Sequence, residues 1–167
     1  MAITKIQSES LNLSDNYDFT GTVTGAGESN VPYCQAYLSA SQSVSSNTTT
    51  VIQFNTTTYD SSSDFDTSNY RYVPSVAGKY LIQINMYNFG ANYSQYFYIR
   101  KNGTSIKEVH IDQSSTTNNP DHRFFSVLTE ANGSSDYFDV TVYFENSTRT
   151  IAHASNGTLF TAFKLTD

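Results

Sequence analysis

The chain has 167 residues, enough for one domain with a core, and its formal net charge of −6 with scattered Lys and Arg argues against a nucleic-acid partner. No apolar run is long enough to cross a membrane, so we expect no membrane insertion, and the single cysteine, Cys34, excludes a disulfide framework within the chain. The 13 Tyr and 11 Phe residues, set among many Ser, Thr and Asn residues, favour strands over helices and predict an all-β fold.

Residues 1–30 differ in composition from the rest of the chain and contain few large apolar side chains. Leu11 and Leu13, and then Tyr17 and Phe19, alternate with polar residues, and several glycines follow before residue 28. This pattern predicts an extended attachment arm with a glycine hinge, which becomes ordered on a partner. The first residues lack the apolar stretch of a secretory signal, so we do not expect secretion.

From residue 31 onward, strand patterns alternate with turn-forming clusters. Residues 32–40 place Cys34, Ala36 and Leu38 on one face of the first expected strand, and the β-branched run at 46–54 predicts a second strand. Residues 58–72 are rich in Ser and Asp and are typical of a loop with aromatic anchors. The strand expected over 79–89 alternates strictly, with Tyr80, Ile82 and Ile84 on one face.

The second half of the chain continues the same pattern. The Asn102-Gly103 pair predicts a type I′ turn within a hairpin over 94–111, and residues 114–121 are expected to form a loop. Further strands are expected at 122–130, 137–145 and 157–165. About eight to ten short strands can bury their apolar faces as two packed antiparallel sheets, so we expect one β-sandwich domain over residues 31–167.

We find no catalytic constellation in the sequence, and we expect a protein that is not an enzyme. His110 and Asp112 lie two positions apart on an expected strand, and Asp121 precedes His122, but their spacing matches no metal motif. We therefore expect no catalytic residue, no resident metal and no cofactor.

Three aspartates, Asp60, Asp64 and Asp66, cluster in the Ser-rich loop. Calcium takes such oxygen ligands, although the positions match no calcium motif. Calcium is therefore the one ion that remains open, and the alternative is a solvated loop with Asx turns.

Eight residues between positions 54 and 84 resemble, in order and spacing, the signature of the complement-1q globular head family, which shares its jelly roll with tumour necrosis factor. The positions are Phe54, Asp60, Phe65, Tyr72, Gly78, Tyr80, Ile82 and Ile84. The family usually has Phe where this chain has Tyr72 and Ile82, and these replacements keep the positions aromatic or apolar. The resemblance implies a jelly-roll sandwich of two antiparallel sheets that assembles as a homotrimer.

The chain departs from this family because it has no collagen-like stem. Residues 1–27 instead resemble N-terminal segments of tail-fibre-like virion proteins of tailed bacteriophages. This second resemblance implies a homotrimeric virion protein, made in the bacterial cytoplasm, whose arm binds other capsid or tail proteins. Host-surface polysaccharide is a further expected contact. The alternatives are a capsid decoration or cement protein without host recognition and a secreted binding module of the complement-1q type.

Overall fold

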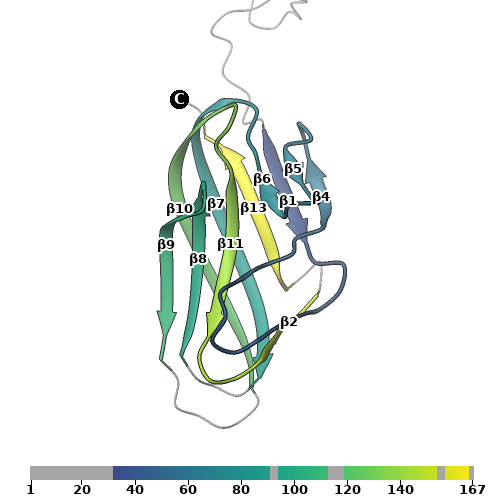
Figure 1. Ribbon diagram of the computed structural model, residues 1–167. Coiled ribbons are helices and arrows are strands. Elements are labelled where there is room, and N and C mark those ends of the chain that lie inside the picture. Colours follow the sequence, from purple (N-terminus) through teal and green to yellow (C-terminus); the bar gives the residue numbers. More distant parts are fainter. Residues whose placement is uncertain (1–31, 91–93, 113–118, 154–156, 166–167) are drawn as a thin grey trace, which may run out of the picture.

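The computed structural model describes residues 32–90, 94–112, 119–153 and 157–165, which form two antiparallel β-sheets packed face to face (Figure 1). The described residues contain no helix, and therefore none that could span a membrane. The strands are β1 (Tyr33–Tyr37), β2 (Gln42–Val44), β3 (Thr50–Val51), β4 (Thr56–Asp60), β5 (Phe65–Asp66), β6 (Arg71–Tyr72), β7 (Ala77–Gly90), β8 (Gln95–Lys101), β9 (Thr104–Ile111), β10 (Asn119–Asn132), β11 (Phe138–Phe144), β12 (Arg149–Ile151) and β13 (Leu159–Lys164).

One sheet has seven strands in the order β2-β12-β7-β13-β1-β4, with β10 paired to the other edge of β7. The other sheet has six strands in the order β5-β6-β11-β8-β9, with β3 paired to β11. Figure 1 views the sandwich from the side of the six-stranded sheet, so that β8 and β11 pass in front of β7. The predicted all-β sandwich of two antiparallel sheets is confirmed.

The core lies between the inner faces of the two sheets and follows the alternation of the sequence. On β11, the side chains of Phe138, Val140, Val142 and Phe144 are fully buried. They share one core cluster with Tyr80, Ile82, Ile84 and Met86, which are the fully buried side chains of β7. Burial of each such side chain contributes about 1.5–3 kcal/mol, so these two strands supply much of the stability of the fold.

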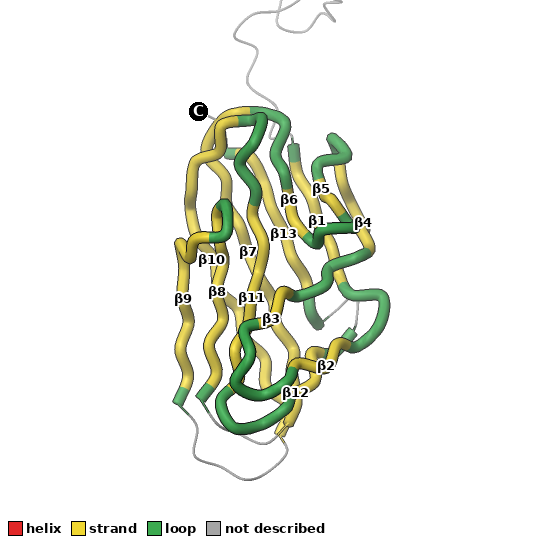
Figure 2. The backbone as a smooth tube through the Cα atoms, in the orientation of Figure 1, coloured by secondary structure: helices red, strands yellow, loops and turns green. Residues whose placement is uncertain are grey.

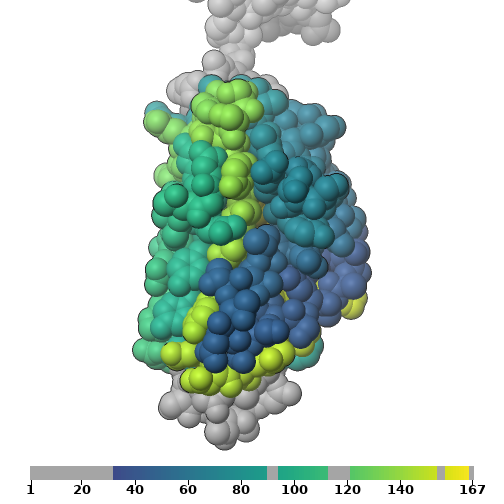
Figure 3. Space-filling view, viewed as in Figure 1, coloured from purple at the N-terminus to yellow at the C-terminus, as the bar shows by residue number. Residues whose placement is uncertain are grey.

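The segment 46–54 differs from its prediction, because only Thr50 and Val51 form a strand there. This segment passes from one sheet to the other, and the side chain of Gln42 replaces part of the ladder. Its Nε2 donates to the carbonyl of Val51 at 2.8 Å, and its Oε1 accepts from the backbone N–H of Gln53 at 2.9 Å. The crossing segment lies over the lower half of the six-stranded side (Figures 2 and 3).

Two expected loops also contain strand residues. Residues 58–72 include the end of β4 and the two-residue strands β5 and β6, which pair with each other. The loop expected over 114–121 ends early, because β10 begins at Asn119, while residues 113–118 lie outside the described residues.

The first and last described parts of the chain lie at the same end of the sandwich (Figure 1). The backbone N–H of Lys164 donates to the carbonyl of Pro32 at 3.0 Å, and that of Leu165 donates to the carbonyl of Lys79 at 2.8 Å. The expected arm over residues 1–30 lies outside the described residues, and its attachment point at residue 32 is therefore at this end.

Candidate self-association surface

The most unusual surface of the molecule is the outer face of the seven-stranded sheet, where side chains point away from the core. The strand register places Leu128 of β10 opposite Leu81 of β7, Leu81 opposite Phe163 of β13, and Phe163 opposite Tyr33 of β1. Four large apolar or aromatic residues thus form one row across four strands.

A second row begins at Phe124, four residues before Leu128 on β10. Phe124 pairs with Asn85 of β7, Asn85 with Leu159 of β13, and Leu159 with Tyr37 of β1. Cross-strand neighbours on one face are close enough to pack, so the apolar side chains of this row present a continuous surface around a single amide.

A polar row separates the two apolar rows. Ser126, Gln83, Thr161 and Gln35 are successive partners across β10, β7, β13 and β1. None of the residues in the three rows is charged, and depletion of charge with enrichment in aromatic side chains is typical of the centre of a protein interface.

Two residues of this face are unusually exposed for their size. Phe124 is 65% exposed and Leu128 is 66% exposed, although both belong to a 14-residue strand. Their strand neighbours Phe125 and Val127 point the other way, toward the core. Large apolar side chains gathered on one exposed face mark interaction sites, so this face is the strongest candidate for assembly.

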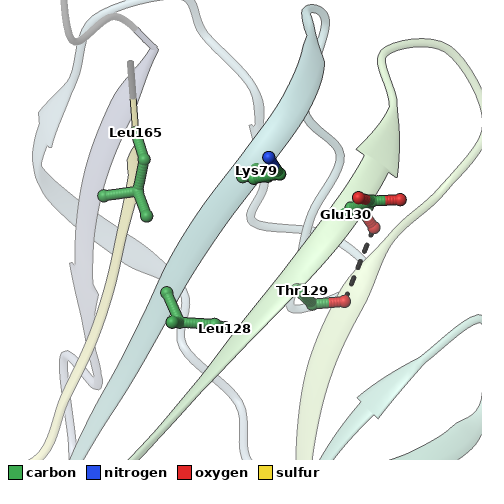
Figure 4. Close-up of a pocket in the computed structure, with 5 residues that line it drawn as sticks. All are labelled: Lys79, Leu128, Thr129, Glu130 and Leu165. Carbon is green, nitrogen blue, oxygen red and sulfur yellow. Dashed lines mark hydrogen bonds between the residues drawn. The ribbon is translucent and has the colours of Figure 1, made fainter. Parts of the chain in front are cut away.

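The face has a shallow groove at the end of the sandwich where β13 ends. Its volume is about 220 Å³, and it is lined by Lys79, Leu128, Thr129, Glu130 and Leu165. Figure 4 shows Leu128 and Leu165 on either side of the ribbon of β7, with Lys79 near the start of that strand and its partner Glu130 on β10. The charged residues thus lie at the margin of the apolar rows, where an interface is ordinarily polar.

The eight residues that resemble the complement-1q signature lie mostly in the core. Six of them have buried side chains: Phe54, Phe65, Tyr72, Tyr80, Ile82 and Ile84. The ring of Phe160 meets those of Phe54, Phe65 and Tyr72 with centroids 5.4–6.1 Å apart. These residues therefore build the sandwich and do not line the candidate surface.

The other two signature residues shape the backbone. Asp60 accepts hydrogen bonds from the backbone N–H groups of Asp64 at 2.9 Å and Phe65 at 3.0 Å, which closes the loop after β4. Gly78 has a φ of 150° near the start of β7, a conformation that residues with a Cβ rarely adopt.

The aspartates of the expected calcium loop are engaged by the protein itself. Asp64 accepts from the N–H of Ser75 at 3.0 Å, and Asp66 accepts from the N–H groups of Ser68 and Asn69 at 3.1 and 3.0 Å. These bonds, with that from the Asn69 side chain first, lower the pKa of Asp66. Nowhere in the described residues do three His, Cys, Asp or Glu side chains gather as a metal site would need.

Of the two histidine and aspartate pairs, the structure brings one together and separates the other. His110 Nε2 lies 3.1 Å from Asp112 Oδ1, so these two do come together on the six-stranded side. Asp121 instead is buried and pairs with Arg123 at 2.6 Å, while the exposed ring of His122 stacks on Tyr87 with centroids 4.2 Å apart.

Cys34 is buried in the core, and its burial raises the pKa of the thiol far above its ordinary value, so that it stays protonated. The four residues expected to anchor the arm, Leu11, Leu13, Tyr17 and Phe19, lie outside the described residues.

Sequence reasoning missed the apolar rows. The stretch 122–130 was expected to be a strand, but its apolar residues occur on both faces, with Phe124 and Leu128 alternating with Phe125 and Val127. A strand that is apolar on both sides is a signal of contact on both sides. That signal is present in the sequence and could have identified this face.

No family model matches the sequence, and no curated protein matches it. Solved structures do match the fold. The Eiger TNF of S. frugiperda is similar with a TM-score of 0.65 and 12% identity, over 81% of this chain and 92% of that one. Murine APRIL at pH 5.0 is similar with a TM-score of 0.63 and 11% identity, over 80% of this chain and 98% of that one. The globular domain of zebrafish complement 1qA is similar with a TM-score of 0.59 and 10% identity, over 80% of this chain and 96% of that one. The chain therefore has the jelly-roll fold of the tumour necrosis factor and complement-1q globular domains.

Proposed function

We propose that the chain is the head of a homotrimeric virion appendage of a bacterial virus, carried on an N-terminal arm and contacting the host surface. The main support for a trimer is the apolar rows on the outer face of the seven-stranded sheet. They contain no charged residue, and Phe124 and Leu128 are about two-thirds exposed in the single chain. Jelly rolls of this type commonly form trimers, which supports association of this face with further copies of the chain.

Burial of the two apolar rows provides the driving force for this assembly, because removal of apolar surface from water contributes roughly 25 cal/mol per Å². The polar row between them has a different role. Ser126, Gln83, Thr161 and Gln35 would lose water on assembly and must find hydrogen-bond partners across the interface. This requirement favours one register of the subunits over others.

The virion location rests on the similarity of residues 1–27 to phage virion segments and on the place where that segment joins the head. Residue 32 lies at one end of the sandwich, next to the end of β13. An arm that leaves from there can reach a capsid or tail protein without crossing either face of the head. The same geometry serves a capsid decoration protein.

The molar mass of the assembly tests the trimer. Light scattering coupled to gel filtration of the full chain at micromolar concentration is expected to give three times the 18.6 kDa chain mass. A monomeric mass would overturn the proposal at its first step.

The virion location needs a separate test. Mass spectrometry of purified virus particles is expected to detect the chain. Its presence in the culture medium but not in particles would favour the secreted module. Immunogold labelling would then distinguish tail from capsid.

We also propose that the head binds and does not hydrolyse. The matching solved structures are not enzymes. Asp112 accepts from Ser94 Oγ at 2.8 Å and lies 3.1 Å from His110 Nε2, so the carboxylate stands between the hydroxyl and the imidazole, whereas a catalytic triad has the imidazole between them. Host capsule incubated with the purified chain should keep its length by gel filtration. Degradation that disappears in a His110→Ala variant would contradict this part of the proposal.

A further inference from the structure

The six-stranded sheet carries a cluster of aromatic rings on its outer face, opposite to the candidate self-association surface. The ring of Tyr96 stacks on His110 with centroids 4.1 Å apart and lies parallel to that of Tyr98 at 6.5 Å. Tyr143 meets Tyr96 edge-on at 5.7 Å. Strand pairing explains the cluster, because Tyr96 is the direct partner of His110 on β9 and of Tyr143 on β11.

These rings border a hollow of about 270 Å³, lined by Thr49, Tyr96, Tyr98, Tyr143 and Glu145. Tyr143 is fixed in place, since its hydroxyl donates to Asn47 Oδ1 at 3.2 Å. Thr49 belongs to the segment that crosses between the sheets, so that this segment forms one wall. The hollow is thus built from β8, the end of β11 and the crossing segment, and not from a single loop.

The surroundings of the hollow are acidic. Glu145 lines it, and Glu108 is the direct strand partner of Tyr98. Neither glutamate forms an ion pair within the described part of the chain. Burial, and then the charge of Glu145, raises the pKa of the Tyr96 hydroxyl, in keeping with a negative potential at the rings.

Two of the cations nearby are already engaged. Arg100, the next outward residue on β8, forms a bidentate pair with Asp139 at 2.7 and 2.6 Å. His110 is paired with Asp112 at 3.1 Å. Arg100 and His110 are therefore not free to neutralise the two glutamates, which flank three tyrosine rings. Lys107, the strand partner of Ile99, forms no ion pair with either glutamate within the described part of the chain.

We infer that this hollow binds an arginine side chain of a partner protein, presented in a basic, exposed segment. A guanidinium group is planar and delocalised, stacks on aromatic rings, and donates hydrogen bonds to carboxylates in a fixed fork. The tyrosines supply the rings, and Glu108 and Glu145 supply the carboxylates. Arginine fits better than lysine, because a compact ammonium cannot both stack on a ring and bridge two acids.

A sugar is the rival occupant, since tyrosines also stack on carbohydrate. Two observations favour the cation. His110 already covers one face of the Tyr96 ring. A flat sugar in the centre of the cluster could therefore not be held between two open ring faces. A neutral sugar would also leave the charge of the two glutamates uncompensated.

The site is independent of the proposed trimer, because it lies on the opposite face of the sandwich. Assembly through the seven-stranded sheet leaves the six-stranded sheet exposed. Arginine binding would thus be available in a trimer and in a monomer alike.

The test is an NMR titration of the full chain labelled at tyrosine ring carbons. A blocked peptide with three arginines is expected to cause saturable shifts in the resonances of Tyr96, Tyr98 and Tyr143, and a citrulline peptide of the same length is not. Glu108→Gln and Glu145→Gln should each weaken binding roughly tenfold. Glu130→Gln removes one acidic charge from the opposite sheet and should leave binding unchanged.

Three results would overturn the inference. They are no shift with the arginine peptide, equal shifts with the citrulline peptide, and unchanged binding in the Glu108→Gln, Glu145→Gln double variant. A neutral oligosaccharide that produces the same tyrosine shifts, in place of the arginine peptide, would assign the hollow to a sugar. The amide signals of each variant check that the fold is intact.

Discussion

The Nζ of Lys101, at the end of β8, lies 2.9 Å from Oδ2 of Asp136, in the turn between β10 and β11. Asp136 also accepts from Asn102 Nδ2 at 2.7 Å and from the N–H of Asn132 at 2.9 Å. The bond from Asn102, followed by that from Lys101, lowers the pKa of Asp136. This carboxylate therefore joins the β8–β9 turn of the six-stranded sheet to the turn that connects the two sheets between β10 and β11.

Replacement of Asp136 with Asn should destabilise the head in a pH-dependent way. A carboxyl whose pKa is lowered by folding stabilises the protein above its unfolded pKa of about 3.9, and this contribution is lost as the pH falls through the folded pKa. Asp136→Asn should lower the free energy of unfolding at pH 7 by roughly 1–3 kcal/mol. The difference from the original chain should shrink below about pH 4. Urea unfolding at pH 7, 5 and 3 measures it, with the exposed Glu130→Gln as control, and a constant difference would contradict the assignment.

Gly133 and Gly103 provide a matched pair of turn glycines. Both have positive φ, 71° and 79°, but a Cβ on Gly133 would lie 2.2 Å from the N of Ala77, whereas one on Gly103 would be 3.5 Å from the Tyr137 hydroxyl. Gly103→Ala should lower the free energy of unfolding by only the backbone penalty of the left-handed conformation, about 1–2 kcal/mol. Gly133→Ala should cost a further ~1–3 kcal/mol for the clash. Guanidinium unfolding compares them, and equal losses would show that the chain relaxes around Ala77 without cost.

Ile82 and Leu81 are neighbours that point to opposite faces of β7. Ile82 is fully buried, so Ile82→Ala should lower the free energy of unfolding by roughly 2–5 kcal/mol. Leu81 lies in an apolar row of the outer face, so Leu81→Ala should have its main effect on assembly. Unfolding and light scattering on the same samples separate the two effects. A Leu81→Ala variant that assembles as tightly as the original chain would argue against this face.

A charge on the outer face gives a sharper test of assembly. Leu128→Asp should convert the trimer to a folded monomer, because it buries an unpaired carboxylate in an apolar row. Tyr98→Asp places the same charge on the opposite sheet and should leave the trimer intact. Sedimentation velocity reports the mass, and circular dichroism reports the fold. If the Tyr98→Asp variant is monomeric and the Leu128→Asp variant remains a trimer, assembly occurs through the six-stranded sheet.

Deletion of residues 2–20 should leave the head folded and trimeric but remove it from virus particles. The expectation follows from the alternating apolar residues Leu11, Leu13, Tyr17 and Phe19, which suit strand addition to a partner's sheet edge. Quantitative mass spectrometry of particles measures the copy number. If the shortened chain is incorporated normally, docking must occur through the jelly roll itself.

The fold was largely predictable because its long strands obey simple alternation. The inward set Tyr80, Ile82 and Ile84 and the Asn102-Gly103 turn were evident in the sequence, and the structure agrees with both. The short strands β2 and β12 were not predicted, because three residues carry too little periodicity. The strand predicted over residues 46–54 was wrong for a different reason. The side chain of Gln42 binds backbone groups of this segment that a strand partner would otherwise bind.

The candidate surfaces were harder to predict than the core. The aromatic cluster depends on Tyr96, His110 and Tyr143, which come from three strands and meet only through register. The abundance of tyrosine is evident in the sequence, but the partner of each ring is not, because a shift of one residue in pairing would move each ring to the opposite face.

The position of β1 has a mechanical consequence for a head held by an arm. The strand starts at the end of the sandwich where residue 32 lies, and it is bonded on both edges, to β13 and to β4. Hydrogen bonds in antiparallel ladders run perpendicular to the strands, so a pull from the arm along the long axis loads the bonds on both edges together in shear. Rupture then requires many bonds to fail at once, whereas a strand peeled sideways loses them one by one. A tether at this end thus pulls the head in the direction in which its first strand resists force best.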